Sequence, residues 1–273
     1  MPKRKKQEEE KSKENSTKEE KTKSTKKKST KEKYVNPLEL LDEYLDEVIN
    51  SLGIAYLNLD REGFKELIKE PFSAAVGEVK SKPKSRTIIN RLLANKEALM
   101  EFLAVKLLRV VNPEKLTNDQ LEFVVFNIKS AIKDLGPWLY EKCNQLNRKD
   151  LEDILRSTWA TYGINSPVKC PKCGFNSIMP DLSCYICKSV ISMKQLKEII
   201  GVISVLQDYY EFDKEGFKEI LTKGYFYYSW DGVIPPGKSK SSDLSLVFEV
   251  ILNKDEKEKL NKFYTAHNIP AQS

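Results

Sequence analysis

Four cysteines are the residues of this chain whose type and spacing most directly predict chemistry. Cys170 and Cys173 form one Cys-x-x-Cys pair, and Cys184 and Cys187 form a second pair after ten intervening residues. Both thiolates of such a pair can bind one ion, because a tight backbone turn brings the two sulfur atoms together. Four sulfur ligands suit a tetrahedral Zn²⁺ and leave no open position for a water molecule. The spacing therefore predicts one structural zinc ion rather than a catalytic one.

The neighbours of the cysteines fit the tight turn known as a zinc knuckle. Pro171 stiffens the first turn, and Gly174 follows it at a position that usually needs a positive φ. Lys188 occupies the matching position in the second turn, which is therefore expected to be the less favourable knuckle. The run Cys-Pro-Lys-Cys-Gly resembles the first knuckle of zinc-ribbon modules, over about residues 166–192 only. Because such modules serve transcription factors, ribosomal proteins, tRNA-modifying enzymes and plain structural roles, the resemblance implies a metal but no task.

Two disulfides or an iron centre are the alternatives to zinc at these cysteines. A lysine-rich chain without a signal peptide is expected to be cytoplasmic, where thiols stay reduced, and this favours zinc. The fifth cysteine, Cys143, falls in a predicted helix and is expected to be a buried apolar residue.

Catalytic residue sets are not evident in the sequence. His267 is the single histidine, which argues against a Cys-His or Ser-His pair. Residues 232–239 match the phosphate-binding pattern Gly-x4-Gly-Lys-Ser, but Pro235 and Pro236 lack the N–H groups that would cradle a phosphate. We therefore expect no enzyme, with chemistry carried by Asp, Glu and Lys alone as the alternative.

Positive charge is concentrated at the N-terminus. Residues 1–33 carry 14 Lys or Arg and 7 Glu, whereas the remaining 32 basic and 33 acidic residues nearly cancel. The absence of apolar residues between Pro2 and Tyr34 predicts a disordered tail over residues 1–34. Such a tail can bind nucleic acid without choosing a sequence, or it can simply keep the protein soluble. The Lys/Glu-rich composition resembles that of archaeal hyperthermophile proteins, although asparagine is common.

Basic side chains elsewhere form clusters that could contact phosphates. One cluster leads into a predicted helix, a second lies on the knuckles, and a third follows the aromatic run Tyr225–Trp230. In a strand, that run would place Tyr228 and Trp230 on one face, where they could stack on bases or pack in a core. The candidate nucleic-acid-binding residues are Lys80, Lys82, Lys84, Arg86, Arg91, Lys169, Lys172, Lys188, Tyr228, Trp230, Lys238 and Lys240.

The elements that must position these residues are mostly helices. Apolar residues recur at helical spacing after caps at Asn36, Asp60, Thr117, Ser192, Asp213 and Asn253. We expect one long helix over about 85–111, a helix after Thr117 that Pro137 ends or kinks, one over about 148–161, one from Ser192 to beyond Leu206, and a last one to about Ala266. Residues 225–230 and 245–252 are expected to be strands joined by a loop at about 231–243.

One segment recurs within the chain. Residues 60–67 and 213–220 share six of eight positions, and Tyr56 corresponds to Tyr209. A duplicated helical hairpin is one interpretation, and two unrelated Asp-capped helices are the other. The spacing of their acidic residues does not match a calcium-binding EF-hand loop.

These observations predict a mainly α protein with four parts. They are a disordered Lys/Glu-rich tail (1–34), a helical domain (35–165), a zinc-binding module (166–192) and an α+β C-terminal domain (193–273) with a short β-hairpin. No apolar run approaches the about 20 residues of a membrane helix. We expect a cytoplasmic, non-enzymatic accessory protein that binds DNA or RNA in replication, transcription or translation. The alternative is an adaptor or scaffold subunit of a larger protein complex, in which the zinc is purely structural.

Overall fold

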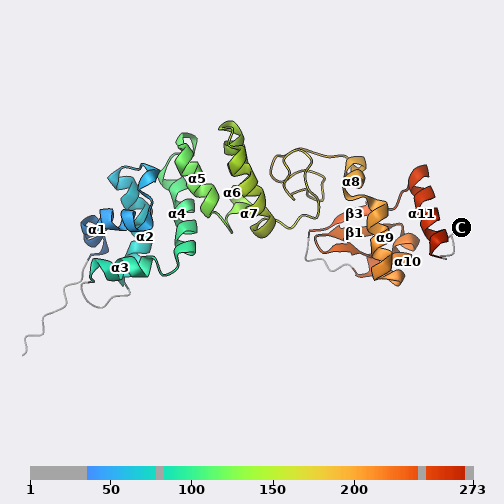
Figure 1. Cartoon of the computed structure of the whole chain (residues 1–273), viewed down its shortest axis with the longest axis horizontal. Coiled ribbons are helices and arrows are strands. Elements are labelled where there is room, and N and C mark those ends of the chain that lie inside the picture. Colours follow the sequence, from blue (N-terminus) through green and yellow to red (C-terminus); the bar gives the residue numbers. More distant parts are fainter. Residues whose placement is uncertain (1–35, 78–82, 239–243, 268–273) are drawn as a thin grey trace, which may run out of the picture. The chain divides into compact units, whose positions relative to one another are not determined.

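The computed structural model describes residues 36–77, 83–238 and 244–267 (Figure 1). The predicted tail lies outside this part of the chain, as do Lys80, Lys82 and Lys240. Helices predominate among the described residues, accompanied by one three-stranded antiparallel sheet. The expected fold class, mainly α with a short β-hairpin, is confirmed.

The first four helices form the start of the helical region. Asn36 caps the first helix through a hydrogen bond from the Leu38 N–H (3.1 Å), as predicted. The single long helix expected over 85–111 is wrong, because the chain breaks after Leu93. The Asn95 side chain there accepts the Ala98 N–H (3.2 Å) and caps a new helix. These helices are α1 (Pro37–Leu52), α2 (Arg61–Gly77), α3 (Ser85–Leu92) and α4 (Lys96–Val110).

The next three helices support the cysteine-containing segment. The predicted capping box at Thr117 and Gln120 is present, but the helix that it opens stops well before Pro137. The Glu101 carboxylate accepts the N–H groups of residues 129 and 130 (3.3 and 2.7 Å), which holds the chain in a turn. Pro137 lies inside the following helix instead of ending one. The helices are α5 (Asn118–Asn127), α6 (Ile132–Gln145) and α7 (Lys149–Tyr162).

The described residues of the C-terminal part form four helices and the sheet. The helix predicted after Ser192 breaks at Gly201, whose φ of 61° ends one helix and starts the next. The predicted cap at Asn253 is present as a complete capping box. The helices are α8 (Met193–Ile200), α9 (Val202–Phe212), α10 (Lys214–Lys223) and α11 (Lys254–Ala266).

The sheet has the strand order β2–β1–β3, with both pairs antiparallel. Strands β1 (Tyr225–Ser229) and β3 (Leu246–Glu249) lie within the predicted segments, whereas β2 (Gly232–Ile234) lies in the segment expected to be a loop. Phe226 and Phe248 are opposite each other and stack at 5.3 Å on the inner face, where both are fully buried. Strand β2 contacts α9 and strand β1 contacts α10, and these elements lie together in Figure 1.

The two similar segments share their cap geometry. Asp60 accepts the N–H of Gly63 (2.7 Å), and Asp213 accepts that of Gly216 (2.9 Å). The residues before the caps differ, because Tyr56 lies in a short 3₁₀ helix and Tyr209 lies in α9. The common feature is thus the Asp-x-x-Gly cap, and a duplication of the whole hairpin stays a prediction.

Candidate metal centre

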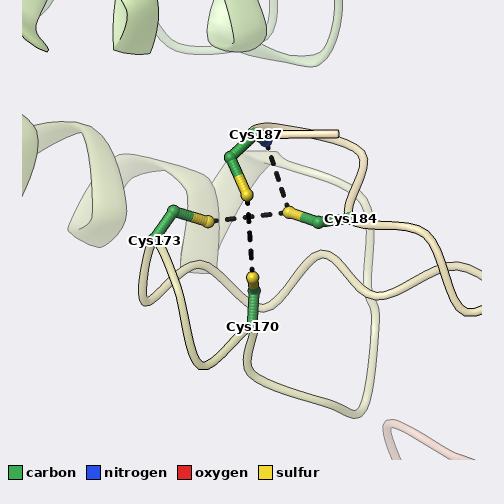
Figure 2. A group of neighbouring side chains, drawn as sticks. All are labelled: Cys170, Cys173, Cys184 and Cys187. Atoms are coloured by element: carbon green, nitrogen blue, oxygen red, sulfur yellow. Dashed lines mark hydrogen bonds between the residues drawn. The ribbon is translucent and has the colours of Figure 1, made fainter. Parts of the chain in front are cut away.

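The four predicted cysteines point their sulfur atoms at a common centre (Figure 2). The Sγ–Sγ distance is 3.8 Å for Cys170–Cys187 and 3.6 Å for Cys173–Cys184, and all four sulfur atoms lie within 4.8 Å of one another. A tetrahedral ion with metal–sulfur bonds of ~2.3 Å needs sulfur atoms about 3.8 Å apart. Among the described residues, this is the one cluster of Cys, His, Asp or Glu side chains that could hold a metal ion.

The two knuckles have the same backbone hydrogen bonds. In the first, the Gly174 N–H donates to the Cys170 carbonyl (2.9 Å), and in the second the Lys188 N–H donates to the Cys184 carbonyl (3.0 Å). Both residues have a positive φ, 79° for the glycine and 60° for the lysine. Lys188 therefore adopts the conformation that glycine adopts more easily, as expected for the less favourable knuckle.

Serine hydroxyls and backbone groups lie within hydrogen-bond distance of the sulfur atoms. Ser177 Oγ is 3.1 Å from Cys184 Sγ, and Ser189 Oγ is 3.0 Å from Cys187 Sγ. Contacts from the Cys173 thiol and from Ser177 lower the pKa of the Cys184 thiol well below its ordinary value. The contact with Cys184 also raises the pKa of Cys173, because the proton is held between the two sulfur atoms. This donor set fits a cation that binds thiolate.

Helix α7 anchors the cysteine segment through side chains that the sequence analysis did not single out. Trp159 is buried, donates its indole N–H to the Asn176 carbonyl (2.8 Å) and stacks on Tyr185 with ring centroids 5.7 Å apart. Arg156 donates to the Cys173 carbonyl (3.1 Å), directly beside a sulfur ligand. Trp159 continues the helical spacing of Leu151 and Leu155, a signal that could have identified it.

Helix α6 also supports the cysteine segment, which it approaches closely at Gly136. A Cβ atom at Gly136 would lie 3.1 Å from the Trp159 ring and 3.2 Å from the Ile186 side chain. Ile186 lies between Cys184 and Cys187 in the second knuckle. Glycine at this position therefore lets the helix reach the second knuckle. On the same helix, Cys143 is fully buried, as predicted, and burial raises the pKa of its thiol to about 11. Such a thiol carries little thiolate and stays separate from the metal centre.

The predicted basic residues that the structure describes belong to separate elements. Lys169, Lys172 and Lys188 are exposed on the knuckles, and no carboxylate pairs with any of them in the described part of the chain. Lys84, Arg86 and Arg91 are exposed at α3, among the N-terminal helices. The knuckle lysines are thus the basic group that the fold brings together with the cysteines.

Lys238 has a structural partner. Its ammonium group lies 2.6 Å from the Asp213 carboxylate, which also accepts the Tyr209 hydroxyl (3.1 Å). The Gly216 N–H and the Lys238 ammonium lower the pKa of Asp213 to about 2. Residues 236–238 form a 3₁₀ helix with no α-helix following in the described residues before β3, so the Gly-x4-Gly-Lys-Ser match lacks the helix of a phosphate-binding loop.

The aromatic strand packs one of its faces toward the core, and this is the face that carries Tyr228. Tyr228 is half-buried on the inner face, where its ring meets Phe248 at 6.0 Å and packs against the core. The outer face carries Tyr225 and Tyr227, with ring centroids 5.8 Å apart. Trp230, in the turn after β1, is 47% exposed, as a stacking residue requires.

Three kinds of comparison with known proteins give no match to this chain. No family model matches it, and neither a curated protein nor a solved structure matches at a significant level. The zinc-ribbon resemblance thus depends on the cysteine spacing and the knuckle geometry alone. No helix in the described residues is long and apolar enough to cross a membrane.

Proposed function

We propose that this chain is a non-enzymatic nucleic-acid-associated accessory protein of replication, transcription or translation, with one structural zinc ion. The observation that carries the proposal is the arrangement of Lys169, Lys172 and Lys188 on the two knuckles. All three ammonium groups are exposed without a carboxylate partner in the described residues. Unpaired cations on a rigid surface attract phosphates, because binding releases the counterions of the nucleic acid.

Zinc is the metal that best suits the four cysteines. A closed set of four sulfur ligands gives zinc its preferred geometry, and zinc has no redox chemistry that the site would need to control. Iron is the competing ion for four thiolates. Metal analysis of the purified chain distinguishes them: about one zinc per chain supports the proposal, and iron or a fraction of a zinc contradicts it.

In this account the zinc ion organises the binding surface without touching the nucleic acid. It joins the two knuckles and thereby fixes the spacing of Lys172 and Lys188, which come from different knuckles. The tail at residues 1–33, with its excess of lysine, adds a second and sequence-independent attraction.

Charge reversal tests the proposal. Replacing Lys169, Lys172 and Lys188 with Glu is expected to weaken the low-salt affinity of the full chain for labelled single-stranded and duplex oligonucleotides, and the binding that remains is attributed to residues 1–33. Replacing Lys115, Lys133 and Lys254, which are also exposed and unpaired in the described residues, changes the net charge equally and serves as the control. Equal losses in both variants would show that total charge, not the knuckle surface, governs binding.

A protein-protein adaptor is the second candidate, and exposed apolar side chains favour it. Phe212 is 87% exposed and Ile251 is 67% exposed, and the outer sheet face carries Tyr225, Tyr227 and Val247. A purified chain that binds no oligonucleotide at low salt but co-purifies with a stoichiometric protein partner after nuclease treatment would favour this function.

A further inference from the structure

A groove lies between α6 and the two zinc knuckles. Its volume is about 580 Å³, and it is open to solvent. Ligand sites commonly span about 300–1,000 Å³, and the volume of this groove lies within that range. We call it the knuckle groove. The polar and aromatic side chains that line it are Trp138, Tyr140, Glu141, Asn144, Lys172 and Lys188.

Aromatic rings line the α6 side of the knuckle groove. Trp138 and Tyr140 are both partly exposed. The Lys142 ammonium, which is ion-paired with Glu114 (2.8 Å), lies 6.0 Å from the centre of the Trp138 ring and fixes one face of it. The Tyr140 ring is held edge-on by Phe175 at 5.6 Å. These rings are pre-positioned by the fold, which lowers the entropy cost of stacking on a planar ligand.

Charge is distributed unevenly across the groove. The knuckle side has Lys172 and Lys188, one from each knuckle and neither paired with a carboxylate in the described residues. The α6 side has the carboxylate of Glu141 and the amide of Asn144. A ligand with an anion at one end and a planar group with hydrogen-bond donors at the other matches this distribution.

We propose that the knuckle groove binds an unpaired base of single-stranded nucleic acid, with the adjoining phosphates against Lys172 and Lys188. This inference rests on the proposed function and narrows it to single strands. Stacking on Trp138 or Tyr140 needs a free face of the base, and in a duplex both faces are already covered by neighbouring pairs. An acidic peptide would satisfy the lysines but would leave the aromatic rings without a planar partner.

Binding of a labelled oligothymidine and of a duplex of equal length to the full zinc-loaded chain tests this assignment. Trp138→Leu and Tyr140→Leu are each expected to weaken single-strand binding by about tenfold, the usual scale for loss of one stacking ring, and to leave duplex binding unchanged. Tyr56→Leu, which removes a ring that is 50% exposed on the N-terminal helices, is the matched control and is expected to have no effect.

Tryptophan fluorescence provides a second measurement that uses no destabilising variant. In a Trp230→Phe chain the remaining emitters are Trp138 and the buried Trp159, so quenching by a saturating single strand reports stacking on Trp138. Zinc content and melting temperature establish that each variant is folded.

The outcomes separate the two proposals. Leucine variants with wild-type affinity, or saturation without quenching, would overturn the base-stacking assignment. The proposed function would stand in that case if Lys172→Gln and Lys188→Gln still weaken binding. Quenching by an aspartate-rich peptide as strong as that by the oligonucleotide would also overturn the assignment. A wild-type chain that binds neither strand form at low salt would remove the proposed function itself.

Discussion

Gly174 and Lys188 occupy equivalent positions in the two knuckles, and the left-handed backbone there gives a matched pair of substitutions. Gly174→Ala is expected to cost about 1–2 kcal/mol of unfolding free energy, the usual penalty of a left-handed conformation for a residue with a Cβ. The new Cβ would also lie 3.2 Å from Arg156 Cδ. Urea unfolding of the zinc-loaded protein measures the change.

Lys188→Gly is the reverse substitution and should not destabilise the folded chain. It relieves the left-handed strain, which offsets the larger backbone entropy of glycine in the unfolded chain. The same change removes a groove lysine, so stability and nucleic-acid affinity are expected to change independently. A loss of stability comparable to that of Gly174→Ala would contradict the equivalence of the two knuckles.

Asp213 links stability to pH at the acid end. Its folded pKa of about 2 lies below the ordinary value of 3.8, so its contribution is fully present above about pH 4. That contribution is lost as the pH falls through 2, when the carboxylate is protonated and releases Gly216 and Lys238. We expect the unfolding free energy to decline over this window, and less steeply in Asp213→Asn.

Asp60→Asn is the control for that titration. Asp60 caps α2 through the same Asp-x-x-Gly hydrogen bond, but no lysine pairs with it in the described residues. Chemical denaturation between pH 2 and 5 compares the two variants. If Asp60→Asn flattened the pH dependence as much as Asp213→Asn does, the ion pair with Lys238 would not be its source.

At the scale of the elements, Trp159 connects α7 to the cysteine segment. Trp159→Ala is expected to lower the unfolding free energy by about 3–5 kcal/mol, as for other buried aromatic residues. It also removes the hydrogen bond to the Asn176 carbonyl. Trp230→Ala, at a site 47% exposed, is the control and should cost far less. Similar costs at both sites, measured by denaturation, would mean that α7 does not support the knuckles.

Helix starts were easier to predict than helix breaks, for a physical reason. A cap such as Thr117 with Gln120 is local, because the residues that satisfy the first N–H groups lie within one turn. The break after Asn127 instead depends on Glu101, which is far away in sequence and accepts N–H groups of the turn. Pro137 was expected to end or kink the helix, but the helix ends earlier, at Asn127, and Pro137 lies inside the next one.

The cysteine quartet was predictable from spacing, but most of its environment was not. Two Cys-x-x-Cys pairs require nothing beyond local turns, whereas the contact of Arg156 with the Cys173 carbonyl needs the packed position of α7. The packing of Tyr228 against the core could not be predicted for the same reason. Alternation separates the two faces of a strand, but only the packing of Phe226 and Phe248 against helices shows which face is inside.

For the whole molecule, metal removal should separate the two proposed modes of nucleic-acid binding. A strong zinc chelator is expected to unfold the knuckles, because structural zinc sites contribute about 10–16 kcal/mol to folding in isolated zinc-finger peptides. Loss of the Trp159–Tyr185 stack would shift the tryptophan emission to longer wavelength. Binding through the knuckle lysines should then be lost, and binding through residues 1–33 should remain.

Cys143→Ser is the control for chelation, because this cysteine is buried away from the quartet and should leave the zinc content unchanged. Cys184→Ser should reproduce the effect of the chelator. A chelated chain that keeps its emission spectrum and its full affinity would show that the metal does not organise the surface.

The salt dependence of single-strand binding tests the central claim, that the zinc-organised knuckle surface contacts phosphates. Each neutralised phosphate contributes about 0.7 to the slope of log affinity against log salt concentration. Replacing Lys169, Lys172 and Lys188 with Gln in the full chain is therefore expected to make the slope shallower by about 2. A slope equal to that of the wild-type chain would contradict the claim.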